Sequence, residues 1–163
     1  MQSKENTGAL REMLASMFPE RYKKKSVYIV HGAPGSGKTT YVQRRRSAND
    51  LVVDMDYLCA ALNGSNSLYQ NYESVLSVAL KLRECVFAEI ESRSGKWENA
   101  WVITASADKK EVADLARRLR GEVIPIDVSR EQCIRNLLND PRRSGHADRF
   151  VALANKWYDK NGL

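Results

Sequence analysis

The order of apolar segments along the chain sets the strongest limit on its fold. From Ser26 onward, short runs rich in β-branched residues alternate with longer segments in which apolar residues recur every three or four positions. Parallel strands buried on both faces give the first pattern, and helices packed on a sheet give the second. The alternation therefore predicts an α/β fold, with a parallel sheet of four or five strands and helices on both faces.

Four runs are short and apolar enough to be the strands. The candidate strands are residues 27–30, 51–53, 101–103 and 123–126. The strongest helix is predicted between the second and third strands, and one face of it is expected to carry Val75, Val78, Ala79, Leu82, Val86 and Ile90. Asp108 and Ser129 begin capping boxes, because a Glu or Gln follows each of them three residues later. Two further helices are predicted after these caps.

Length and composition indicate one domain. The chain has 163 residues, which suits a single core, and residues 26–163 are expected to form it, preceded by a helical appendage with a basic stretch at residues 1–25. No apolar run approaches the roughly 20 residues needed to span a bilayer, and residues 1–11 lack the apolar segment of a secretory signal. We therefore expect a cytoplasmic protein, with Cys59, Cys85 and Cys133 reduced and buried.

The charge balance suggests a polyanionic partner. The formal net charge is +6 and the sequence pI is near 9.3. Clustered Lys and Arg attract phosphates, so nucleic acid is a candidate partner. The clusters are small, however: residues 21–25, 44–46 and 142–143 contain them. A solvated basic surface is the alternative interpretation.

One motif predicts phosphate binding. Residues 32–39 read G-A-P-G-S-G-K-T and match G-x-x-x-x-G-K-[ST], after a predicted strand and at the start of a helix. Glycines let such a loop wrap its N–H groups around an anion, while Lys38 reaches the β- and γ-phosphates and the Thr39 hydroxyl binds Mg²⁺. ATP with Mg²⁺ is the expected ligand. The candidate binding residues are Gly32, Ala33, Pro34, Gly35, Ser36, Gly37, Lys38, Thr39 and Thr40.

Two carboxylates follow the second predicted strand. Asp54 and Asp56 come at its carboxyl end, the edge of an open α/β sheet where ligands bind. One carboxylate is a candidate magnesium ligand, for which we name Asp54, and either is a candidate base toward an attacking hydroxyl. The alternative is that one of them only caps the next helix. On an extended chain we expect these two side chains to point in opposite directions, with one carboxylate functional and the other capping the helix or positioning the substrate.

Two arginines are candidates for a lid over the phosphates. Arg142 and Arg143 lie between two predicted helices, beside Pro141 and Gly145. A guanidinium can clamp phosphate oxygens in bidentate fashion, and such a connection can close over a bound ligand. A solvated connection with incidental charge is the alternative.

From Ser26 through the final helix the chain resembles the small phage and bacterial P-loop kinase-like proteins related to polynucleotide kinase. The segments I-V-H-G-A-P-G-S-G-K-T-T-Y and V-V-D-M-D-Y-L carry the resemblance. It implies that Asp54 or Asp56 acts as base toward a nucleic-acid 5′-hydroxyl, and that Arg142 and Arg143 correspond to the lid arginines. Two positions depart from the polynucleotide kinase pattern. Residues 57–60 lack its arginine, and residues 104–106 are Thr-Ala-Ser, where it has an acidic residue.

The expected function is a P-loop phosphotransferase that moves the γ-phosphoryl group of ATP to a hydroxyl or phosphate acceptor. Lys38, Asp54, Asp56, Arg142 and Arg143 are its candidate catalytic residues. Two other classes stay open at this point. One is an NTPase that drives an assembly step, and the other is a nucleotide-binding regulatory protein without turnover, which the uncharged Ala105 and Ser106 leave open.

Overall fold

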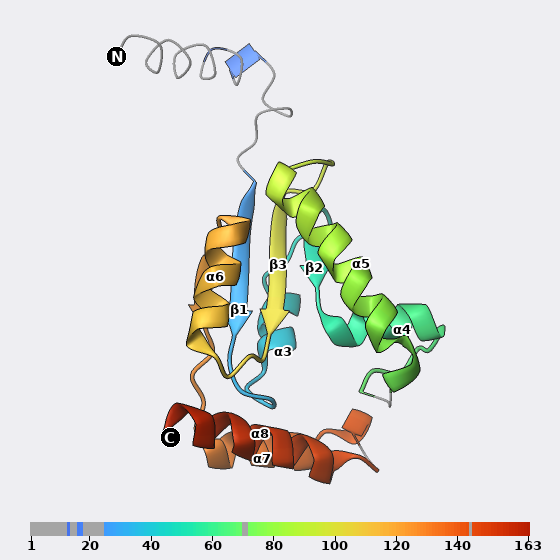
Figure 1. The fold of residues 1–163 in the computed structure, drawn as a ribbon, viewed down its shortest axis with the longest axis vertical. Coiled ribbons are helices and arrows are strands. Elements are labelled where there is room, and N and C mark those ends of the chain that lie inside the picture. Colours follow the sequence, from blue (N-terminus) through green and yellow to red (C-terminus); the bar gives the residue numbers. More distant parts are fainter. Residues whose placement is uncertain (1–12, 14–15, 18–24, 70–71, 144) are drawn as a thin grey trace.

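The computed structural model describes residues 13, 16–17, 25–69, 72–143 and 145–163. Nearly all of the predicted appendage at residues 1–25 lies outside these described residues. The strands are β1 (Ser26–His31), β2 (Leu51–Val53), β3 (Asn99–Thr104) and β4 (Glu122–Pro125). They form an all-parallel sheet in the order β2-β3-β1-β4 (Figure 1).

Helices cover both faces of the sheet and cross its carboxyl edge. They are α3 (Lys38–Gln43), α4 (Met55–Asn63), α5 (Glu73–Ser92), α6 (Lys109–Leu119), α7 (Arg130–Leu138), the 3-10 turn η1 (Pro141–Arg143) and α8 (Ala147–Asn161). In Figure 1, α5 and α6 lie in front of the sheet and α3 behind it, while α7 and α8 pack side by side beneath the strand ends. The predicted α/β fold is confirmed, with four strands. None of the described helices is both long and apolar enough to cross a bilayer.

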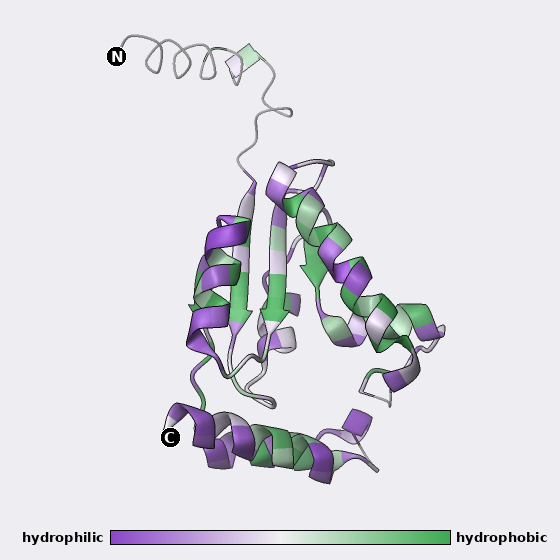
Figure 2. Ribbon diagram, viewed as in Figure 1, coloured by the Kyte–Doolittle hydropathy of each residue, from purple (hydrophilic) through white to green (hydrophobic). Residues whose placement is uncertain are grey.

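Alternating residues of β1 and β3 supply two separate cores. Val27 and Ile29 face α5 and α6, where Ile90 and Leu119 join them. Their neighbour Val30 faces the opposite side, against α3. The strands are therefore apolar along most of their length, whereas the outer surface of α6 is strongly hydrophilic (Figure 2). This burial on both faces is the reason that the strands appear in the sequence as unbroken apolar runs.

The helix face predicted for α5 is partly wrong. Ala79 and Ile90 are buried as expected, but Val78 is 51% exposed and Leu82 is 38% exposed. Apolar residues occur around much of this helix, and only one stripe of it meets the sheet and α4, so the pattern alone does not select the buried side. Cys85, expected to be buried, is exposed on the same helix.

Both predicted capping residues begin helices. The Asp108 carboxylate accepts from the N–H groups of Lys110 and Glu111, and the Ser129 hydroxyl accepts from the Gln132 N–H. These caps fix the starts of α6 and α7. The start of α7 also fixes its position against the loop of residues 32–39, where Asn136 donates to the Gly35 carbonyl.

Candidate functional site

The loop between β1 and α3 has a backbone that favours glycine at two positions. Gly35 has a φ of 82° and Gly37 a φ of 90°, in the left-handed region. A Cβ atom on Gly35 would lie 2.6 Å from the Cys133 carbonyl oxygen, whereas one on Gly37 would meet nothing within 4 Å. Gly35 is thus required for the close approach of α7, and Asn136 of α7 also donates to its carbonyl at 2.9 Å.

Lys38 and Ser36 place polar groups inside this loop. The Lys38 ammonium donates to the carbonyls of Gly32 at 2.8 Å and Ala33 at 2.7 Å, and the residue is only 8% exposed. Burial lowers the Lys38 pKa to about 8, opposed by the charge of Asp54. The Ser36 hydroxyl is buried with no hydrogen-bond partner among the described residues. A bound phosphate would satisfy both groups, so the loop fits this ligand.

Thr39 and Asp54 bring hard oxygen atoms together at the start of α3. The Thr39 hydroxyl donates to Asp54 Oδ2 at 3.2 Å. The other carboxylate oxygen, Oδ1, accepts from the Asp56 N–H at 3.0 Å, which makes Asp54 the N-cap of α4. Burial raises the Asp54 pKa, opposed by hydrogen bonds from the Asp56 N–H and the Thr39 hydroxyl. A hydroxyl and a carboxylate beside a triphosphate site are the ligand types that fit Mg²⁺.

Asp56 lies in the first turn of α4 and lines the same cleft as Asp54. Burial and the negative charge of Asp54 together raise the pKa of Asp56 to about 6, opposed by the positive charges of Arg143 and Lys38. The expectation that an extended chain points the two carboxylates in opposite directions is wrong, because residues two apart on a strand share a face. The strand also ends before them, since β2 ends at Val53 and α4 begins at Met55. The two carboxylates nevertheless differ, since Asp54 is engaged as a cap and Asp56 has no hydrogen bond to its carboxylate among the described residues.

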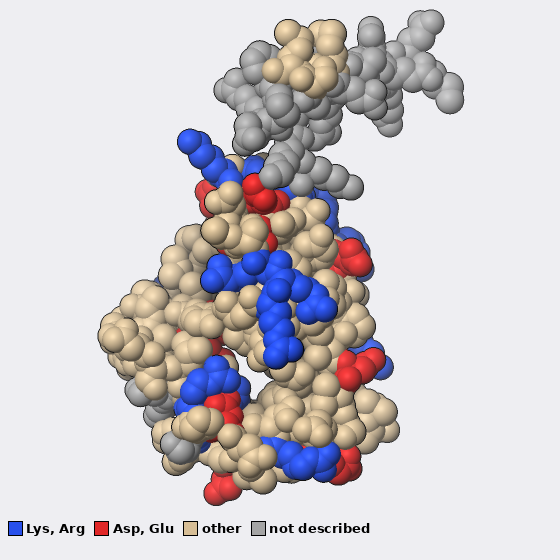
Figure 3. Space-filling view, turned by 180° about the vertical axis from the view of Figure 1, so that it is seen from behind, with Lys and Arg blue, Asp and Glu red and all other residues tan. Residues whose placement is uncertain are grey.

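These groups line one cleft of about 1170 Å³ at the carboxyl edge of the sheet. Figure 3 shows it from behind as a hollow between the body of the molecule and the α7–α8 layer. Its predicted lining residues are Pro34, Gly35, Ser36, Gly37, Lys38, Thr39, Thr40, Asp54, Asp56, Arg142 and Arg143, whereas Gly32 and Ala33 are buried and do not line it. The volume exceeds the 300–1,000 Å³ of typical small-molecule pockets, which leaves room for a nucleotide and a second substrate.

The two predicted lid arginines lie in different environments. Arg143 is nearly buried, with a side chain 12% exposed, and its Nε atom donates to Asp140 Oδ2 at 3.1 Å. Its guanidinium carbon lies 3.7 Å from the centre of the Tyr69 ring and 4.5 Å from that of the Phe150 ring. Arg142 is 54% exposed and pairs with the other oxygen of Asp140 at 2.8 Å. Arg143 is therefore the arginine held within the cleft.

Sequence reasoning missed the three residues around Arg143. Asp140 offered a signal, because a carboxylate directly before a Pro-Arg-Arg segment can pair with both arginines. Tyr69 and Phe150 offered none, since they contact Arg143 only through the tertiary fold.

The arginine pair holds the pKa of Asp140 at about 2, below its ordinary value of 3.8. A carboxylate whose pKa is lower in the folded state than in the unfolded state stabilises the fold at pH values above its unfolded-state pKa. This stabilisation is lost as the pH falls towards the folded-state pKa. We expect Asp140→Asn to lower the free energy of unfolding by about 1–2 kcal/mol at pH 7. The deficit should shrink as the pH falls from 5 towards 2 in urea unfolding. Asp127→Asn, at an exposed carboxylate, is the control; an Asp140→Asn deficit that does not depend on pH would contradict the assignment.

Three arginines follow α3 on the back of the molecule. Arg44, Arg45 and Arg46 are exposed, and Figure 3 shows basic side chains gathered in this region above the hollow. The Arg45 guanidinium lies 3.7 Å from the centre of the Tyr41 ring. Arg44 and Arg45 also line the cleft, so positive charge borders its mouth.

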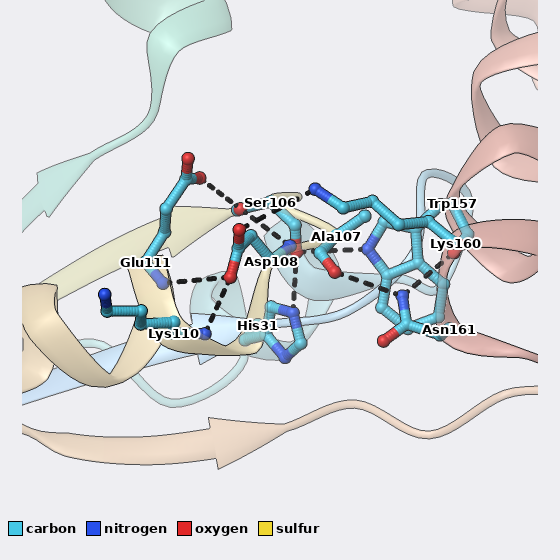
Figure 4. Close-up of polar contacts among 9 residues, drawn as sticks. All are labelled: His31, Ser106, Ala107, Asp108, Lys110, Glu111, Trp157, Lys160 and Asn161. Carbon is cyan, nitrogen blue, oxygen red and sulfur yellow. Dashed lines mark hydrogen bonds and ion pairs between the residues drawn. The ribbon is translucent and has the colours of Figure 1, made fainter.

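The residues after β3 attach α8 to the sheet (Figure 4). The Ser106 carbonyl accepts from Trp157 Nε1 at 3.2 Å and lies 2.8 Å from His31 Nε2. Asn161 donates to the Ala107 carbonyl at 3.3 Å. His31 is thus hydrogen-bonded, and the segment after β3 holds the carboxyl-terminal part of α8 in place.

Comparisons with known proteins support the fold. No known family model and no curated protein sequence matches the chain. Among solved structures, a shikimate kinase from Acinetobacter baumannii in complex with shikimate matches with a TM-score of 0.53 and 16% identity, covering 85% of this chain and 77% of that one. The chain has the fold of the P-loop kinases. A chain of the Pnkp1/Rnl/Hen1 RNA repair complex matches with a TM-score of 0.51 and 18% identity over 83% of this chain. The match spans only 45% of that longer chain.

Proposed function

We propose that this protein transfers the γ-phosphoryl group of ATP to a hydroxyl acceptor. The observation that carries the proposal is the pair of the buried Asp54 and the half-buried Asp56, which line the same cleft as Lys38 and Thr39 of the loop after β1. A nucleotide site alone would fit many NTPases. Asp56, the second carboxylate, lines the same cleft and is not engaged as a cap, so it is available to accept the proton of an attacking acceptor hydroxyl.

Each group has a role that follows from its chemistry. The Lys38 ammonium exchanges its loop carbonyls for phosphate oxygens and stabilises their charge. Thr39 and Asp54 would hold Mg²⁺, which would supply positive charge to neutralise the charge that develops on the phosphate oxygens. Arg143 lies close enough to influence the titration of Lys38, Asp54 and Asp56, and its guanidinium would bind the transferring phosphoryl group.

Asp56 favours a hydroxyl over a phosphate as acceptor. Its raised pKa of about 6 lies near neutral pH, where a carboxylate is ionised and still basic enough to accept a proton. A phosphate acceptor would bring negative charge up to the buried Asp54 and the half-buried Asp56, and such repulsion is large in a partly desolvated cleft. A neutral hydroxyl avoids this cost and can donate a hydrogen bond to Asp56.

The basic surface beside the cleft favours a hydroxyl carried by a nucleic acid. Arg44, Arg45 and Arg46 would contact phosphates of a strand whose end reaches the cleft, and the net charge of +6 has the matching sign. The similarity to a chain of an RNA repair complex supports the same class of acceptor.

The two carboxylates provide the test of this proposal. Asp56→Asn should lower the transfer rate by at least a hundredfold with little change in ATP affinity, because the amide cannot accept the hydroxyl proton. Asp54→Asn should raise the Mg²⁺ concentration needed for half-maximal transfer, because an amide is a poorer metal ligand than a carboxylate. It should also destabilise α4, because the amide is a poorer helix cap. Transfer to a hydroxyl oligonucleotide and nucleotide binding would be measured for both. If both variants retain wild-type turnover, neither carboxylate takes part and the proposal fails.

A further inference from the structure

Arg143 is held by residues from two different parts of the fold. Asp140 and Phe150 belong to the α7–α8 layer, whereas Tyr69 belongs to the connection between α4 and α5 on the opposite side of the cleft. The Tyr69 side chain is buried, and its ring lies 5.8 Å from that of Phe150 at 83°, an edge-to-face arrangement. Tyr69, Phe150 and Arg143 thus join the two walls of the cleft, and we call these three residues the clasp.

Asp140 alone cannot fix the position of Arg143 relative to the phosphate-binding loop. It lies three residues before Arg143, so their ion pair moves with the segment that carries both. Phe150 is on α8 and moves with the same layer. Tyr69 is the member of the clasp that belongs to the wall carrying Asp54 and Asp56, and only such a contact sets the distance between the guanidinium and those carboxylates.

The two ends of α8 are attached in different ways. Near its carboxyl end, Trp157 and Asn161 donate to backbone carbonyls that follow β3 (Figure 4). Near its amino end, the Phe150 ring packs edge-to-face on Tyr69 of the α4–α5 connection. Just before the helix, the guanidinium carbons of Arg143 and Arg142 lie 3.7 and 5.3 Å from the centre of the Tyr69 ring. A polar anchor at one end and a ring-stacked guanidinium at the other would hold the layer across the cleft.

The Tyr69 backbone agrees with a side chain held in place. Its φ of 68° lies in the left-handed region, which is uncommon for a bulky residue other than glycine. Such a conformation persists where the surroundings impose it, and these residues cluster at ligand-binding segments.

We propose that Tyr69 is a positioning residue that fixes Arg143 over the phosphoryl-transfer site. The proposal rests on the proposed function, because it gives Arg143 a task there. The Tyr69 ring provides a flat, electron-rich face for the guanidinium. Nε of Arg143 donates to Asp140, whereas its terminal N–H groups make no hydrogen bond among the described residues and can donate to phosphate oxygens. Tyr69 itself makes no bond to substrate; its effect on transfer passes through Arg143.

The experiment compares Tyr69→Leu and Tyr69→Phe with Tyr72→Leu in the full chain. Tyr72 is a matched control, because it is a buried tyrosine of the same connection that packs on α4 and α5 away from Arg143. Tyr69→Leu should lower kcat at least tenfold and change KM for ATP by less than threefold, since the affected group acts in the transition state. Tyr69→Phe keeps the ring and should restore the rate to within about threefold of wild type. Tyr72→Leu should leave kcat within about twofold of the wild-type value.

A double-mutant cycle separates positioning from a purely structural role. If Tyr69 acts through Arg143, then Tyr69→Leu should lower kcat no further in the Arg143→Ala background. Independent losses that multiply in the double variant would overturn the proposal, as would a wild-type kcat in Tyr69→Leu.

Trypsin provides a readout that needs no activity. Release of the clasp exposes Arg143, so Tyr69→Leu should be cut after this residue at least fivefold faster than Tyr72→Leu under conditions where both are folded. Cleavage of both variants at the same rate would contradict the clasp even if the protein transfers no phosphoryl group. If Tyr69→Leu is cleaved faster but the wild-type protein has no transferase activity, the contact between Tyr69 and Arg143 is supported and only the proposed function is refuted.

Discussion

Replacement of Lys38 by alanine is expected to lower the affinity for ATP at least a hundredfold while the domain stays folded. The Lys38 ammonium is buried, and among the described residues it donates to the loop carbonyls of Gly32 and Ala33. We therefore expect it to serve ligand binding rather than the apolar core. Its pKa, lowered to about 8 by burial, indicates that a cation is held there at a cost in solvation. Removing it should therefore leave the melting temperature unchanged or slightly higher.

Titration calorimetry with a non-hydrolysable ATP analogue and Mg²⁺ measures this effect, with thermal unfolding in parallel. Lys109→Ala, at an exposed lysine in the first turn of α6, is the matched control for the loss of one positive charge. If Lys38→Ala binds the analogue as tightly as the control variant does, the loop is not a triphosphate site.

Arg143→Ala should slow phosphoryl transfer by about a hundredfold or more, with KM for ATP changed less than about threefold. A guanidinium that binds charge developing in the transition state lowers the barrier, whereas uniform ground-state binding would change KM alone. Arg143→Lys should recover only part of the rate, because an ammonium cannot reproduce the planar fork or its stacking on Tyr69.

Arg142→Ala is the matched control for this prediction, and it should cost less than about fivefold. The Arg142 side chain is half exposed at the edge of the cleft and pairs with the same Asp140 as Arg143 does. Arg142→Ala therefore removes a guanidinium of identical chemistry that is not held within the cleft. Steady-state rates at saturating ATP and acceptor decide the matter. Equal losses in the two variants would mean that the arginines act through general charge, and wild-type rates in both would remove them from the mechanism.

The strands, the loop and the caps were predictable from the sequence because their signals are local. β2 was predicted with its observed bounds, Leu51–Val53, since a buried parallel strand must be an unbroken apolar run. The loop from Gly32 to Thr39 was predictable because its backbone demands glycine at fixed spacing, as the positive φ values of Gly35 and Gly37 require.

The arrangement of the candidate site depends on contacts that the sequence does not encode locally. Tyr69 and Arg143 are 74 positions apart, and nothing near either residue indicates that they meet. The different positions of Asp54 and Asp56 were not predicted, because they depend on where α4 begins. Asp54 is the single residue between β2 and α4, and Asp56 already lies in the helix, so neither continues the strand. The exposed Val78 and Leu82 show the same limit for α5, whose buried side is selected by its neighbours.

The most direct test of the account follows the labelled γ-phosphoryl group of ATP in the presence of Mg²⁺. The wild-type protein would be incubated with an oligonucleotide bearing a 5′-hydroxyl, with the same oligonucleotide bearing a 5′-phosphate, and with no acceptor. If the protein transfers the γ-phosphoryl group to a hydroxyl, label should appear on the hydroxyl oligonucleotide and ATP consumption should depend on this acceptor. Release of inorganic phosphate at one rate in all three reactions would identify an NTPase, and binding of ATP without consumption would identify a regulatory protein; either result would contradict the proposed transfer.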